Sequence, residues 1–146
     1  MNNLYPVGIQ NFREIREGNY LYIDKTALIY RMVKTGKYYF LSRPRRFGKS
    51  LLISTIEAYF LGKKDLFNGL AMENLETEWK EYPVLHLDLN SKKYEDKSSL
   101  TAILNQHLEK WEQMYGDNKR DRSPEERFSY LIEKISTTTG RNVVVL

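Results

Sequence analysis

A short basic segment at residues 43–50 has the residue types and spacing of a phosphate-binding loop. Such loops usually follow the pattern G-x-x-x-x-G-K-[ST], in which backbone N–H groups surround the anion and a helix follows. The segment reads Arg-Pro-Arg-Arg-Phe-Gly-Lys-Ser, so it keeps the second glycine, the lysine and the serine, and Arg43 occupies the place of the first glycine. The pattern predicts a site for the phosphates of a nucleotide.

Each retained residue has its own role in that chemistry. Gly48 permits a positive φ and lets the backbone approach the phosphates closely. Lys49 can reach the β- and γ-phosphate oxygens, and the hydroxyl of Ser50 is a ligand for Mg²⁺. The alternative interpretation is a solvated basic turn before an ordinary helix, with no ligand.

The distribution of charge favours the phosphate site. The chain has 23 Lys and Arg residues against 19 Asp and Glu residues, a net charge of +4. Residues 41–50 contain four basic side chains and no acidic one, so the charge of this segment equals the net charge of the whole chain. Basic side chains at the start of a helix oppose its macrodipole by about 0.3–1 kcal/mol each. A bound anion would turn this repulsion into attraction.

Length and composition exclude several other classes of protein. A chain of 146 residues fits one domain. The absence of cysteine excludes disulfides, thiolate zinc sites and cysteine nucleophiles, and is consistent with a reducing compartment. No apolar run approaches the roughly 20 residues that span a bilayer, and the first residues lack the features of a signal peptide. We therefore expect a cytoplasmic protein without membrane contact.

The loop lies between a predicted strand and a predicted helix, which is the context that the motif requires. Tyr38–Leu41 is an aromatic, apolar run typical of a strand. A helix is predicted from about Lys49 to Gly62. Its apolar residues recur on one face: Leu52, Ile53, Ile56, Tyr59 and Phe60.

Helices and strands alternate along the rest of the chain. A capping box with proline, at Ser123–Glu126, predicts the start of a helix that ends at Gly140. Strands separated by helices indicate parallel pairing and an α/β fold. The other predicted elements are a short helix or loop at 12–18, an extended stretch at 20–23, a helix at 24–34 capped by Asp24, a strand at 83–89, a helix at 98–115 and a strand at 143–146.

The loop and three other segments resemble the AAA-ATPase-like family of bacterial proteins. The Arg-Pro-Arg-Arg-Phe-Gly-Lys-Ser form is that family's own variant of the loop, and the segments 19–26, 62–70 and 82–88 are similar to further family motifs. The similarity runs from about residue 5 to the end. It implies a partial P-loop NTPase fold of the RecA or AAA kind, a three-layer sandwich with a mainly parallel sheet, in one truncated domain over residues 1–146.

The resemblance also implies ATP as the nucleotide, with Mg²⁺ held by Ser50. In similar proteins the last strand leads directly into the acidic Walker B residues, which this chain lacks. It therefore implies the N-terminal part of an ATPase, which alone binds nucleotide weakly, does not hydrolyse it and contains no catalytic residue. Arg45 or Arg46 would contact phosphate or a neighbouring subunit. The expected nucleotide-binding residues are Arg45, Arg46, Phe47, Gly48, Lys49, Ser50 and Leu51.

A nucleic-acid-binding module is the alternative function. In this interpretation the arginine-rich loop binds backbone phosphates, with a steep dependence on salt. Proteins similar to this chain often carry a PD-(D/E)XK nuclease-like domain further along. The resemblance therefore leaves open a nucleic-acid partner bound through a downstream domain, as well as a homo-oligomer.

Four other polar side chains have both a functional and a structural interpretation. Asp88 either reaches metal or water, or begins a turn with Asn90. Asp24 either contacts the nucleotide region or caps its helix. His86 and His107 are not at ligand spacing from each other or from an acid, so we expect packed or surface histidines.

Overall fold

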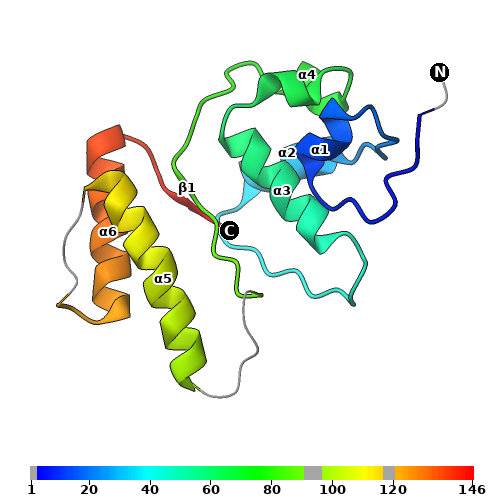
Figure 1. Ribbon diagram of the computed structural model, residues 1–146. Helices are drawn as coiled ribbons and strands as arrows, with labels where there is room; N and C mark the ends of the chain where they lie inside the picture. Colours follow the sequence, from blue (N-terminus) through cyan, green and yellow to red (C-terminus); the bar gives the residue numbers. More distant parts are fainter. Residues whose placement is uncertain (1–2, 91–96, 117–120) are drawn as a thin grey trace. The chain divides into compact units, whose positions relative to one another are not determined.

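The computed structural model describes residues 3–90, 97–116 and 121–146 (Figure 1). These residues fall into two compact units, residues 1–81 and 82–146, which we call the N-terminal unit and the C-terminal unit. The helices and the parallel strand pair are compatible with the predicted α/β class.

The N-terminal unit is helical and is built around an aromatic core. Phe12 and Phe67 are fully buried, and their ring centroids lie 4.9 Å apart. Trp79 packs on Phe67 with a centroid distance of 5.1 Å. The helices are α1 (Phe12–Glu17), α2 (Thr26–Thr35), α3 (Lys49–Phe60), the short 3-10 helix η1 (Lys64–Phe67) and α4 (Ala71–Leu75).

Asp24 ties the start of α2 to the start of α4. One of its carboxylate oxygens accepts hydrogen bonds from the N–H and the hydroxyl of Thr26, at 2.8 and 2.6 Å, and the other accepts from the N–H of Ala71 at 2.7 Å. Partial burial alone would raise the pKa of Asp24, but these hydrogen bonds outweigh it and hold the pKa below its ordinary value. Asp24 thus has the predicted structural role at the start of α2, but the N-cap itself is Lys25, one residue later than predicted.

A buried carboxylate, that of Glu76, links three parts of the N-terminal unit. One oxygen accepts the hydroxyl of Tyr59 on α3 and lies 3.0 Å from the ammonium of Lys34 on α2. The other accepts the N–H groups of Thr77 and Glu78 at 3.1 Å each. Burial works to raise the pKa of Glu76, but the hydrogen bonds to the ionised form prevail and lower it to about 2.

We expect this carboxylate to make the stability of the protein depend on acid pH. The pKa of Glu76 is lowered from an ordinary 4.5 to about 2, so its ionised form stabilises the fold above pH 4.5. That contribution, on the order of 2 kcal/mol, is lost as the pH falls from 4.5 towards 2. Urea unfolding of the protein and of Glu76→Gln at pH 6 and pH 2.5 measures it. The unfolding free energy of the variant should fall less between the two pH values, and equal losses would assign the effect to other groups.

The C-terminal unit contains a parallel strand pair and two long helices. Val84 pairs with Val144 and Leu85 with Val145, so the predicted parallel pairing is confirmed. Parallel neighbours need a long crossover connection, which the two helices provide. The elements are β1 (Val84–Leu85), α5 (Lys97–Tyr115), α6 (Pro124–Thr139) and β2 (Val144–Val145). The buried core residues are Leu85, Leu108, Trp111, Leu131 and Ile135.

The ends of α6 follow the predicted signals. The hydroxyl of Ser123 accepts the N–H of Glu126 at 3.3 Å, Pro124 takes the first helical position, and Gly140 ends the helix with a φ of +65°. Between α5 and α6 lies a buried ion pair that the sequence analysis missed. The guanidinium of Arg127 donates to both carboxylate oxygens of Glu112, at 2.8 and 3.0 Å.

The strand predicted at Tyr38–Leu41 is not formed, and this prediction is wrong. Within the described ranges no segment pairs with these residues, and the side chains of Tyr38 and Phe40 are 94% and 93% exposed. Aromatic residues favour strands only where cross-strand neighbours cover them. The strands at 83–89 and 143–146 are likewise shorter than predicted, and the three-layer sandwich stays a prediction.

Candidate functional site

The basic loop leads directly into α3, as predicted. Residues 41–48 contain no helix or strand, and Lys49 is the first residue of the helix. Gly48 is its N-cap with a φ of +75°, and its carbonyl accepts the N–H of Leu52 at 2.9 Å. The N–H groups of the first turn therefore begin at the residues that the motif assigns to phosphate binding.

The backbone of the loop alternates in the sign of φ. Arg46 has a φ of +66° and Gly48 a φ of +75°, whereas Phe47 between them does not have a positive φ. Alternation of this kind turns successive N–H groups towards one side and creates a concavity that suits an anion. A positive φ is uncommon in a residue with a side chain and costs about 1–2 kcal/mol, so Arg46 adopts a strained conformation in this loop.

All the predicted site residues up to Ser50 are exposed, and the loop is strongly basic. Arg43, Arg45, Arg46 and Lys49 form no ion pair with any part of the chain that the structure describes. The first turn of α3 contains no acidic residue. Four positive charges without an ion-pair partner among the described residues thus lie on the loop and first residue of α3, where an anion would relieve their repulsion.

The body of α3 is anchored to the segment before α1. The hydroxyl of Ser54 accepts the N–H of Phe12 at 2.9 Å and contacts the carbonyl of Gln10 at 3.4 Å. Figure 1 shows the segment before α1 beside α3. Sequence reasoning missed Ser54, because its bonds connect residues 42 and 44 positions apart along the chain.

Asp88 and the two histidines belong to the C-terminal unit. The carboxylate of Asp88 accepts the N–H of Asn90 at 2.9 Å, which confirms the predicted turn. A ring nitrogen of His107 lies 3.0 Å from the carbonyl of Asp88. His86 is partly buried in the segment after β1. Within residues 3–90, 97–116 and 121–146, no three Asp, Glu or His side chains are placed to hold a metal ion.

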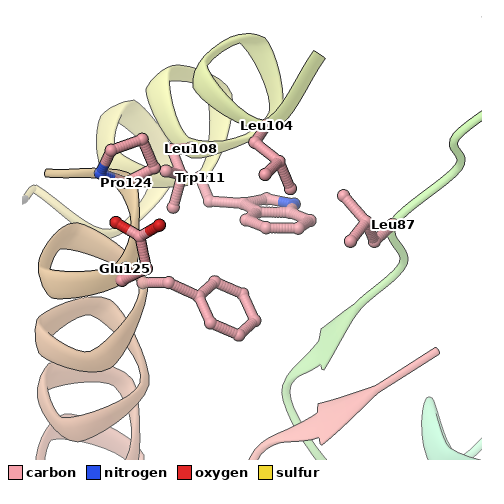
Figure 2. A pocket seen from close by; sticks show the side chains of 7 residues that line it. Leu87, Leu104, Leu108, Trp111, Pro124 and Glu125 are labelled. Carbon is pink, nitrogen blue, oxygen red and sulfur yellow. The ribbon is translucent and has the colours of Figure 1, made fainter. Parts of the chain in front are cut away.

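The C-terminal unit has an apolar cavity of about 160 Å³ between its two helices and the segment after β1 (Figure 2). Trp111, on α5, and Leu87 border it, and Glu125 is the charged residue in its lining. It contains none of the predicted site residues. The remaining lining residues are Leu104, Leu108, Pro124 and Phe128.

No helix in the described ranges combines the length and the hydropathy needed to cross a bilayer.

Comparison with known proteins assigns the family. A family model described as "Predicted AAA-ATPase" matches residues 6–146. A protein of Azotobacter chroococcum mcd 1, named "Uncharacterized protein in vnfD 5'region", is 38% identical over 142 residues, which are 97% of this chain and 28% of that protein. The chain thus spans well under a third of that relative. No solved structure matches this chain. The family match covers the basic loop and both units, and the chain belongs to the AAA-ATPase-like family.

Proposed function

We propose that residues 45–51 bind Mg²⁺-ATP as a variant Walker A loop. The observation that carries the proposal is the alternation of φ at Arg46, Phe47 and Gly48, directly before the first turn of α3. It supports an anion site made of main-chain N–H groups, which does not depend on the identity of the side chains. Family membership supports a nucleotide as the anion.

The side chains of the loop fit the phosphates and the metal. Lys49, at the first position of α3, would extend its ammonium to the β- and γ-phosphates, and the exposed hydroxyl of Ser50 would ligate Mg²⁺. Mg²⁺ bound to a nucleotide takes most of its ligands from phosphate oxygens and water, so one protein hydroxyl suffices to position it. Arg45 and Arg46 would add charge.

Substitution of Gly48 tests whether the backbone conformation carries the site. A Cβ at Gly48 would meet no heavy atom within 4 Å, so Gly48→Ala changes only the preference for a positive φ. The strain of about 1–2 kcal/mol should shift the loop away from its anion-binding conformation and lower ATP affinity about tenfold. Isothermal titration calorimetry with Mg²⁺-ATP measures the effect.

Gly69→Ala is the matched control for this experiment. Gly69 has a φ of +76° and equally open space, so the substitution imposes the same strain outside the loop. It should reduce thermal stability to a similar extent and leave ATP affinity unchanged. Equal ATP affinities for both variants would show that the conformation of Gly48 does not matter for binding.

Binding of single-stranded nucleic acid is the second candidate, and the exposure of aromatic rings favours it. Tyr38, Phe40 and Phe47 are 94%, 93% and 64% exposed and flank the basic residues of the loop. Bases stack on such rings while cations bind the backbone phosphates. This function predicts binding of a single-stranded oligonucleotide that weakens steeply with salt, with little preference for ATP over the oligonucleotide.

A further inference from the structure

The apolar cavity of the C-terminal unit lies between elements that are tied to their neighbours. The buried ion pair of Glu112 and Arg127 holds α5 against α6. On the third side, the N–H of Leu87 donates to the carbonyl of Leu146 at 2.8 Å, which anchors the segment after β1. The walls of the cavity are thus fixed by bonds outside it, and its volume of about 160 Å³ belongs to the folded unit.

The size and the lining of the cavity suit one aromatic ring. Trp111 on α5 and Phe128 on α6 contribute rings whose centroids are 6.1 Å apart, with an angle of 42° between their planes. Figure 2 shows the indole of Trp111 extending towards Leu87 across the cavity. Apolar cavities of about 150 Å³ stay free of water and accept a benzene ring. An aromatic guest also gains offset or edge-to-face contacts with the rings of the lining.

Glu125 gives the cavity a preference for positive charge. It is exposed in the first turn of α6, so the cavity reaches the surface at this residue. Among the residues that the structure describes, Glu125 forms no ion pair. Arg127 bonds to Glu112 instead. The guanidinium of Arg122 lies 4.4 Å from the ring centroid of Tyr130. The carboxylate of Glu125 is therefore available to a cation at the mouth of the cavity.

We propose that this cavity binds a small aromatic amine, with its ring against Trp111 and Phe128 and its ammonium group on the carboxylate of Glu125. The apolar lining disfavours a ring that carries polar groups, because these would be buried without hydrogen-bond partners. A cation without a ring lacks the apolar surface whose burial drives binding. The loop at residues 43–50 belongs to the N-terminal unit, and this inference does not rest on the proposed function.

Calorimetric titration of the 146-residue chain with 2-phenylethylammonium tests the site. The uncharged analogue 2-phenylethanol should bind about three- to fivefold more weakly, which is the difference expected of an ion pair at an exposed carboxylate. Glu125→Gln should lower the affinity for the ammonium probe by the same factor and leave that for 2-phenylethanol unchanged. Glu126→Gln removes the same charge from the same helical turn, outside the cavity lining, and should leave both affinities unchanged.

Leu104→Phe provides a second measurement, because the half-buried Leu104 lines the cavity and a larger side chain fills it. It should abolish binding of both probes, with thermal denaturation as the check that the variant folds. Leu100→Phe, the same change at an exposed leucine one turn earlier on α5, should leave binding unchanged. Lys49→Ala should also leave it unchanged, which separates this site from the nucleotide site. If the unsubstituted chain does not bind 2-phenylethylammonium, or binds both probes equally, the inference is wrong.

Discussion

Replacing Lys49 by alanine is expected to lower the affinity for Mg²⁺-ATP by about 10- to 100-fold. Hydrogen bonds to a charged partner contribute about 1.5–3 kcal/mol, which corresponds to this range. Lys49 is exposed and forms no ion pair with the described residues, so its removal should not destabilise the fold. Calorimetric titration with ATP and with tripolyphosphate measures the loss, and both ligands should be affected alike.

Lys63→Ala is the control, because it removes the same charge from an exposed residue of the same unit. It should reduce ATP affinity less than twofold. Binding of a single-stranded oligonucleotide to the same variants separates the two candidate functions. If Lys49→Ala abolishes ATP binding and leaves oligonucleotide binding nearly intact, the nucleotide site is supported. A loss of both in proportion to the charge removed would favour the nucleic-acid module.

The largest effect on stability is expected at the ion pair between α5 and α6. Glu112 and Arg127 are 1% and 5% exposed, and the guanidinium also donates to Asn105 at 2.9 Å. The hydrogen bonds to Glu112 raise the pKa of Arg127 above its ordinary value. Glu112→Leu leaves a buried charge without its partner and should lower the free energy of unfolding by about 3–5 kcal/mol.

The double variant Glu112→Leu/Arg127→Met distinguishes the cost of an unpaired charge from a loss of packing. Replacing both partners by apolar residues of similar volume is often neutral or stabilising, so the double variant should regain most of the stability. Urea denaturation of the three proteins provides the measurement. A double variant that is no more stable than Glu112→Leu would contradict the electrostatic explanation.

Charge patterns and capping signals that lie within a few residues could be interpreted from the sequence. The start of α3 at Lys49, the cap of α6 at Ser123 and the positive φ of Gly48 agree with the predictions. Each depends on neighbouring residues, because a cap needs one side chain and one nearby N–H group. The family, too, could be identified from the basic loop and three short segments.

Contacts between distant residues could not be predicted in this way. Nothing in the sequence around Glu76 or Glu112 indicates that these charged side chains are buried. Both are buried because residues 15 to 42 positions away form hydrogen bonds and ion pairs with their carboxylates. The bond of Ser54 to Phe12 spans 42 positions, and it brings Gln10 to the side of α3.

The sequence by itself determined that a basic loop leads into a helix at Lys49 with Gly48 in a left-handed conformation, because the charges and the glycine of such a loop act within one turn. Only the tertiary structure decided that Tyr38–Leu41 forms no strand and which segment lies beside α3. A strand forms only if another segment pairs with it, and a loop takes its position from the residues that bind it. In both cases the partner lies far away along the chain, so the segment's own residues do not reveal it.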